Sequence, residues 1–167
     1  TRGLHLQIVR YALLRLESKI ADAKNWRPNI LVLSGIPTKR WHLIDFAYGL
    51  VQEKGLITVA TILPEKGVAQ ERVGKHAHNI ASYLREKNIK TLVRVIKAED
   101  PFVGAKQLVN SYGLGSLVPN TVLLGDTEES AHYNSYCNMI THFYQSSRNV
   151  VILENDFELE YGGAKKI

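Results

Sequence analysis

The sequence predicts an α/β fold: a doubly wound, mostly parallel five-stranded sheet with flanking helices and an extra N-terminal helix. Short runs of β-branched and leucine residues alternate with segments of helical periodicity, an order typical of parallel sheets with right-handed crossovers. The runs do not alternate with polar residues, which indicates strands buried on both faces. Two of the runs follow a Pro-Asn dipeptide, at Pro28-Asn29 and at Pro119-Asn120, and both lead to a glycine. Proline lacks an N–H donor and therefore stands just before a strand.

The first segment, Leu4–Lys24, is expected to form a helix. Its apolar side chains recur at alternating spacings of three and four residues, at Leu6, Val9, Leu13, Leu16 and Ile20. Two interpretations stay open. The helix packs on its own domain, or it is a connector that meets a partner chain or joins a membrane domain. In the second case the candidate dimer contacts are Leu6, Leu13 and Ile20.

Five strands and four helices are expected after this segment. The expected strands are Ile30–Leu33, Leu56–Leu63, Thr91–Ile96, Thr121–Leu124 and Val150–Leu153. The first two helices are indicated by apolar positions from Trp41 to Val51, ending near Gly55, and from Val73 to Leu84. The third begins at Asp100-Pro101, with an N-cap followed by proline, and ends at Gly113. The fourth is expected to start at Asp126 or Thr127 and to run through Phe143.

Composition limits the classes of function. The chain of 167 residues is long enough for one domain with a real core, and its net charge is +5. The charge suits either a face turned toward anionic lipid headgroups or a mildly basic solvated surface, and the dispersal of Lys and Arg along the sequence favours the latter. Since the sequence lacks an aromatic-rich basic motif, no nucleic-acid partner is expected. The single Cys137 excludes an internal disulfide and is expected to be a buried structural thiol.

Ligands of doubly wound sheets bind beyond the C-terminal ends of the strands, so the residues expected there were weighed as sites. The turn Ser34-Gly35, with Lys39 and Arg40 nearby, is a candidate for holding a nucleotide phosphate, although no glycine-rich phosphate motif accompanies it. Acidic residues at the same edge are explained as helix N-caps, at Asp100 and Asp126.

The sequence predicts no catalytic residue, no cofactor-binding residue and no metal site. The histidines do not converge, and His76 and His78 stand two apart on an expected helix, so they point to different faces. Ser34 follows a strand as some nucleophiles do, but the glycine pattern of a nucleophile elbow is missing. A hydrolase built on Ser34 is therefore the weakest of the functional hypotheses.

Two phrases carry a family resemblance. They are Trp26-Arg27-Pro28 with Gly35-Ile36-Pro37, and Tyr112-Gly113-Leu114-Gly115 with Val118-Pro119-Asn120-Thr121. Together they resemble the cytoplasmic C-terminal domain of the cation-chloride cotransporters, the Na-K-Cl, Na-Cl and K-Cl symporter family. The resemblance runs from about Asn25 to about Glu154, with departures at Val118 and at Lys39-Arg40-Trp41.

This resemblance implies a non-enzymatic regulatory and dimerisation domain on the cytoplasmic face of a membrane, without a cofactor. Electroneutral, Na- or K-coupled chloride symport would be performed by a membrane domain outside this chain. The implied partners are a second copy of the chain and that membrane domain. The expected division is a connector helix over 1–24, an α/β subdomain over 25–158, and the start of a further segment over 159–167.

A free-standing adenine-nucleotide-binding protein of the universal-stress type is the alternative. In such proteins a glycine-rich turn follows the fourth strand. Here the corresponding segment, Gly125–Ser130, has one glycine and three acidic residues, which would repel a triphosphate in the absence of a metal.

Overall fold

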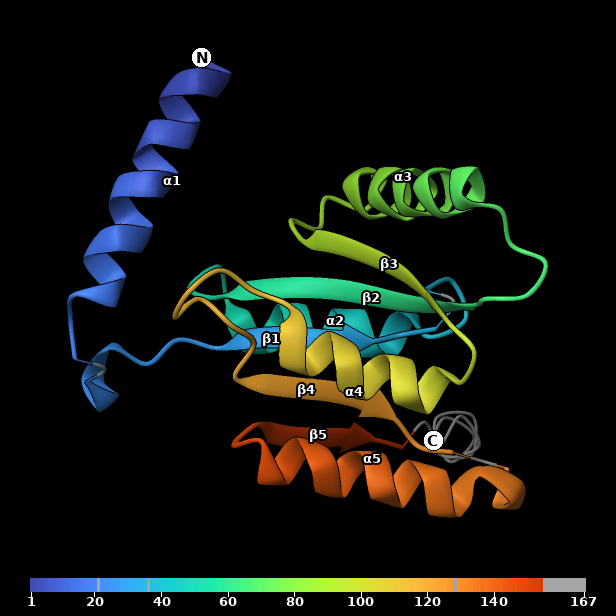
Figure 1. Ribbon diagram of the computed structural model, residues 1–167. Helices are drawn as coiled ribbons and strands as arrows, with labels where there is room; N and C mark the ends of the chain where they lie inside the picture. The colour runs from blue at the N-terminus through green and yellow to red at the C-terminus, as the bar shows by residue number, and fades with distance from the viewer. Residues whose placement is uncertain (21, 36, 128, 155–167) are drawn as a thin grey trace, which may run out of the picture.

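The structure, a computed structural model, describes residues 1–20, 22–35, 37–127 and 129–154 (Figure 1). Five strands form one sheet in the order β3-β2-β1-β4-β5, and every neighbouring pair is parallel. The strands are β1 (Asn29–Leu33), β2 (Leu56–Pro64), β3 (Leu92–Ala98), β4 (Thr121–Gly125) and β5 (Asn149–Leu153). The predicted α/β class with a doubly wound sheet is confirmed.

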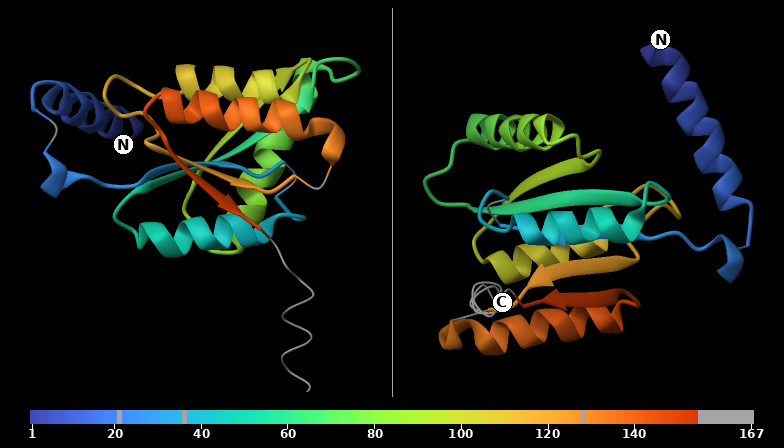
Figure 2. Two further views of the ribbon diagram at one scale, coloured as in Figure 1. Left: turned by 90° about the horizontal axis from the view of Figure 1, so that it is seen from below. Right: turned by 180° about the vertical axis from the view of Figure 1, so that it is seen from behind.

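Four helices cover the two faces of the sheet (Figures 1 and 2). On one face lie α2 (Trp41–Val51) and α3 (Gln70–Glu86), and on the other lie α4 (Pro101–Ser111) and α5 (Tyr133–Gln145). Neighbouring residues of the central strand β1 enter opposite cores: Val32 packs with α2 and α3, while Leu31 packs with α4 and α5. Burial on both faces explains why the sequences of the central strands β1 and β4 are continuously apolar.

Helix α4 begins and ends as its sequence predicts. The Asp100 carboxylate accepts hydrogen bonds from the backbone N–H groups of Phe102 and Val103, at 2.7 and 3.3 Å. It therefore pairs two of the donors that every helix N-terminus leaves free. Beyond the C-terminal end, Gly113 has φ +135°, a conformation that side-chain-bearing residues rarely adopt.

The predicted start of the last helix is wrong. A 3₁₀ turn, Ser130–His132, precedes α5, which begins only at Tyr133. Asp126 does not cap this helix, because its carboxylate accepts a bond from the adjacent Thr127 N–H at 2.8 Å. Side-chain bonding to the neighbouring backbone competes with helix formation, so an acidic residue here signals a turn as readily as an N-cap.

The expected burial of Cys137 is also wrong, because this thiol is exposed. Helix α5 turns Tyr136, Met139 and Phe143 into the core, and Cys137 lies outside that face. Spacings of three and four residues select one side of a helix, and the neighbour of a buried residue points about 100° away from it.

Asn120 joins the two Pro-Asn phrases at the N-terminal ends of β1 and β4. Its side-chain amide donates to the Arg27 carbonyl oxygen at 2.7 Å, and its side-chain oxygen accepts from the Asn29 N–H at 3.0 Å. The two segments are distant in sequence, and this side chain bonds the backbone of one to the start of the other. The motifs that carry the family resemblance therefore have a structural role at the edge of the sheet opposite the strand C-termini.

Replacing Asn120 with alanine is expected to lower the free energy of unfolding by about 1–3 kcal/mol, because the half-buried Asn29 N–H and the exposed Arg27 carbonyl both lose their partner. Urea unfolding measures the change. Asn110→Ala is the matched control, since the exposed Asn110 amide bonds the ring of His142 at 3.1 Å, and it should change stability by less than about 0.5 kcal/mol. Equal effects from the two substitutions would argue against the role given to Asn120.

The N-terminal helix α1 (Arg2–Glu17) stands apart from the α/β body (Figures 1 and 2). None of its residues is buried, so the interpretation that it packs on its own domain is wrong. It ends well before the expected Lys24. The Ser18 hydroxyl donates back to the Arg15 carbonyl at 2.9 Å, and the Asp22 side chain caps a short 3₁₀ turn, Ala23–Asn25. Local side-chain bonding of this kind replaces helix where no core contact holds the chain.

Candidate functional site

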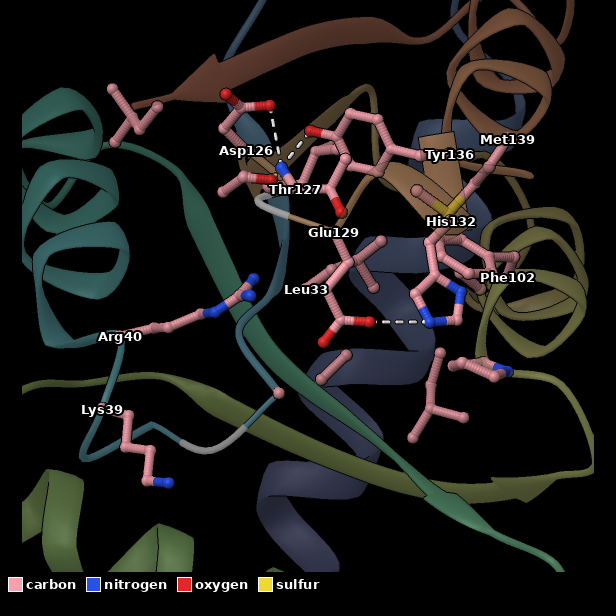
Figure 3. Close-up of a pocket in the computed structure, with 18 of the residues that line it drawn as sticks. Leu33, Lys39, Arg40, Phe102, Asp126, Thr127, Glu129, His132, Tyr136 and Met139 are labelled. Carbon is pink, nitrogen blue, oxygen red and sulfur yellow. Dashed lines mark hydrogen bonds and ion pairs between the residues drawn. The ribbon is translucent and has the colours of Figure 1, made fainter. Parts of the chain in front are cut away.

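The sheet has a topological switch point between β1 and β4. From β1 the chain adds β2 and then β3 on one side, and it then returns to add β4 and β5 on the other side of β1. Ligands of such sheets bind beyond the strand C-termini at this place. A pocket of about 720 Å³ opens there, with Leu33, Gly35, Leu124 and Gly125 from the two central strand ends in its lining (Figure 3). Its volume lies in the range of small-molecule and nucleotide sites.

One wall of the pocket is cationic. Lys39 and Arg40 of the loop that enters α2 both line the pocket, and the Arg40 side chain extends toward the facing wall (Figure 3). A Cβ atom added to Gly125 would lie 3.2 Å from a terminal nitrogen of Arg40, so this guanidinium reaches across to the end of β4. His42 lines the same wall, and its burial, with the Arg40 charge beside it, lowers the pKa of its imidazole. The structure therefore brings Gly35, Lys39 and Arg40 together, as the sequence suggested.

Ser34 does not share in this arrangement. Its side chain is fully buried, and its hydroxyl has no hydrogen-bond partner among the described residues. The neighbouring Gly35 carbonyl accepts from the Thr61 hydroxyl at 2.7 Å, which fixes the turn. A serine nucleophile needs a base within hydrogen-bond reach, and no such base contacts Ser34 in the described part of the chain.

The facing wall combines acidic, aromatic and imidazole groups. The carboxylate of Glu129 and the ring of His132 form an ion pair with an Nε2–Oε2 distance of 2.9 Å (Figure 3). The His132 ring also packs on Phe102, with their centroids 5.7 Å apart. The Tyr136 hydroxyl donates to the Gly125 carbonyl at 2.7 Å. Burial, together with the charge of Asp126, raises the pKa of Tyr136 to about 12, so this phenol stays a neutral donor in the physiological range.

Sequence reasoning missed this second wall. Glu129, His132 and Tyr136 follow the fourth strand within a dozen residues, and that position is the signal that could have found them. The mistaken start of α5 assigned the first two to a helix surface. In the structure they line the mouth of the pocket with Phe102 and Met139 of the α4–α5 side.

Among residues 1–154 as described, no three His, Cys, Asp or Glu side chains converge as a metal site would need. His76 and His78 are exposed on α3. Within the same ranges no helix is both long and apolar enough to cross a bilayer. The pocket thus offers charge and hydrogen bonds for holding a ligand, and no nucleophile–base pair is formed by its described hydrogen bonds.

These features define a doubly wound α/β domain with a polar pocket at its switch point. A sequence profile of solute carrier family 12 matches residues 40–166, more than half of the chain, and the chain belongs to that family. This membership confirms the resemblance that the two Pro-Asn phrases predicted.

Two solved structures resemble the fold. One is the cytoplasmic domain of a prokaryotic cation chloride cotransporter, with a TM-score of 0.54 and 16% identity over 80% of this chain and 48% of that one. The other is a universal stress protein family member from Burkholderia pseudomallei, with a TM-score of 0.45 and 10% identity over 75% of this chain and 95% of that one. The chain thus spans about half the length of the cotransporter domain that it matches.

Proposed function

We propose that this chain is a cytoplasmic regulatory and dimerisation domain of a cation-chloride cotransporter, whose membrane part carries the ions. Membership of solute carrier family 12 supports the transporter assignment. The single observation that carries the assembly role is helix α1, which presents apolar side chains to solvent along its whole length. Coupling to Na⁺ or K⁺ is part of the proposal, since the cotransporter resemblance implies it.

An isolated α1 is poorly suited to water. A helix of 16 residues gains little stability from backbone propensity and normally depends on packing. The stripe formed by Leu6, Val9, Leu13 and Leu16 follows the spacing of a helix–helix seam, and all four side chains lie outside the core of this copy. A second copy of α1 presents the same stripe and can cover it in an isologous dimer.

A polar contact connects this helix to the body. The Ser116 N–H donates to the Glu17 carboxylate, which joins the end of α1 to the loop leading into β4. Gly115 in that loop has φ +56°, and a Cβ atom there would collide with the Glu17 side chain. The positive φ favours glycine at this position, and the contact with Glu17 is a route by which the position of α1 can act on the central strands.

Sedimentation equilibrium tests the assembly role. The intact chain is expected to show twice its 18.8 kDa mass at high concentration. The same chain without residues 1–17 should sediment as a monomer. Its far-ultraviolet circular dichroism should still show the signal of the remaining helices α2 to α5. A monomer mass for the intact chain at every concentration, or a dimer that survives the deletion, would overturn the role given to α1.

A second candidate function is the binding of an adenine nucleotide in the switch-point pocket. The observation that favours it is the placement of Lys39 and Arg40 beside the open turn at Gly35, where a phosphate chain would lie in such folds. The carboxylates of Asp126 and Glu129 on the far wall make a divalent cation a necessary companion of a triphosphate.

Thermal unfolding with Mg-ATP tests this candidate. A ligand at a hundred times its Kd stabilises the folded state by about 2.7 kcal/mol. For a domain of this size that corresponds to roughly 5–10 °C in Tm. The shift should disappear in Lys39→Ala/Arg40→Ala and persist in Lys19→Ala/Lys24→Ala, which removes two exposed charges away from the pocket. An unchanged Tm for the wild-type chain at millimolar Mg-ATP would eliminate the candidate.

A further inference from the structure

We propose that the face formed by α3, the edge strand β3 and the turn between them binds the headgroups of an anionic lipid bilayer. Residues 70–97 contain seven Lys or Arg and two Glu, an excess of five, which equals the net charge of +5 of the whole chain. The remainder of the chain therefore holds equal numbers of acidic and basic residues. The inference rests on the proposed function, because it needs a domain held close to a membrane.

The fold concentrates a charge that looks dispersed along the sequence. The segment spans α3 and β3, and β3 forms one edge of the sheet with α3 packed on it (Figure 1). The core side of α3 is taken by Ile80 and Leu84, and its basic residues Arg72, Lys75 and Arg85 are exposed, together with Glu71 and Glu86. The opposite edge differs, because strand β5 carries no charged residue between Asn149 and Leu153. The positive potential is thus a property of one side of the molecule.

The basic side chains of this face are available to a partner. Three of them, all on α3, are exposed and have no side-chain hydrogen bond or ion pair within the described ranges: Arg72, Lys75 and Arg85. Arg94 is exposed as well but lies on the other side of the sheet, because its register partner Ala60 belongs to the core formed with α4 and α5. Lys90 lies 3.9 Å from Glu53, and both side chains are strongly exposed, a geometry that contributes little to stability. Protection of an open strand edge accounts for Arg94 on β3, but it does not explain the charges on α3.

The same face lacks what a nucleic-acid site requires. Single-stranded nucleic acids are held by exposed aromatic rings on which bases stack. The only aromatic residue of the segment is Tyr83. Its partly buried ring packs edge-on against Trp41, at 5.8 Å between centroids, and its other contact is the ammonium of Lys87. Lipid headgroups need charge alone, and each Lys or Arg close to an anionic surface strengthens binding about fivefold.

Vesicle co-sedimentation of the full chain tests the proposal. The wild-type chain is expected to bind phosphatidylcholine vesicles that contain phosphatidylserine and not to bind vesicles of phosphatidylcholine alone. It should dissociate from the anionic vesicles as the salt concentration is raised. The variant Arg72→Glu/Lys75→Glu/Arg85→Glu, with all three changes on α3, should bind roughly a hundredfold more weakly, because three attractive charges are lost. The control Lys19→Glu/Lys24→Glu/Arg27→Glu makes the same change in net charge at exposed positions away from this face and should bind within a few-fold of wild type.

Three results would overturn the proposal: no binding of the wild-type chain to the anionic vesicles, binding that is insensitive to salt, or equal losses in the two variants. An unstructured RNA that competes fully for the same side chains at the same concentration would make the face a nucleic-acid site instead. A failure of lipid binding is distinguishable from a failure of the proposed function. The charge variant leaves α1 unchanged, so the dimer mass of this variant can be measured separately. Wild-type salt dependence stays informative even where a variant does not fold.

Discussion

Replacing Phe143 with alanine is expected to lower the free energy of unfolding by about 3–5 kcal/mol. Phe143 is fully buried on α5, within the core that Leu31 and Val122 form with α4. Removing the ring leaves a cavity that the surrounding strands, packed on both faces, cannot fill. Because domains of this kind are stable by only about 5–15 kcal/mol, the loss is a large share of the total. Urea unfolding followed by circular dichroism measures it.

The neighbouring Tyr144 is the matched control for this prediction. It is also aromatic and on the same helix, but 77% of its side chain is exposed. Tyr144→Ala should change the free energy of unfolding by less than about 0.5 kcal/mol. If the two substitutions had similar effects, the assignment of the α5 core face would be wrong.

The second large effect is expected at α1. The double variant Leu6→Glu/Leu13→Glu should weaken dimerisation roughly a hundredfold or more, because each copy would bring two like charges into an apolar seam. In this copy 61% of Leu6 is exposed, Leu13 is only partly buried and no residue of α1 is in the core, so the substitution should leave the stability of the α/β body unchanged. Sedimentation velocity across a dilution series measures the dissociation constant, and thermal unfolding checks the body.

Leu4→Glu/Leu14→Glu provides the comparison. It makes the same chemical change on the same helix, at exposed positions outside the seam of Leu6 and Leu13. Its dimer should remain within a few-fold of wild type. A dimer that is indifferent to the seam substitutions, or equally sensitive to both pairs, would place the interface elsewhere.

The central strands β1 and β4 could be predicted because both of their faces are buried. Val32 and Leu31 enter the two separate cores, so the sequence of β1 has no polar face and reads as a continuous apolar run. The same holds for β4, where every residue is buried. The Pro-Asn phrases marked the starts of both strands. Their further role depends on a hydrogen bond from Asn120 across the sheet, which no local pattern contains.

Only one of the two walls of the candidate site, the cationic one, could be predicted from the sequence. Lys39 and Arg40 could be predicted as site residues because they follow the first strand. In a doubly wound sheet ligands bind beyond the C-terminal ends of the strands, so the residues that follow a strand are candidates. The facing wall was missed because the start of α5 depends on whether Asp126 bonds its neighbour or caps a helix, and both are common for aspartate. The position of Cys137 could not be predicted because it depends on which face of α5 meets the core, and adjacent helical residues point about 100° apart.

The extent of α1 could not be predicted from its apolar pattern either. The periodicity runs on to Ile20, which is 97% exposed in a segment that is no longer helical. A pattern of apolar residues shows which face of a helix is suited to burial. It does not show whether the surface that covers this face belongs to the same copy of the chain or to another. Where the partner is absent, side-chain bonds at Ser18 and Asp22 decide the local structure.

Ion uptake by the polypeptide that carries this domain together with its membrane part tests the central claim most directly. Rubidium uptake in cells producing it is expected to require chloride, to fall when gluconate replaces chloride, and to fall again in Leu6→Glu/Leu13→Glu at equal surface abundance. That result would establish both cation-chloride cotransport and control by α1. Uptake that is independent of chloride would contradict the transporter assignment, and chloride-dependent uptake unchanged by the α1 variant would contradict the regulatory role of this domain.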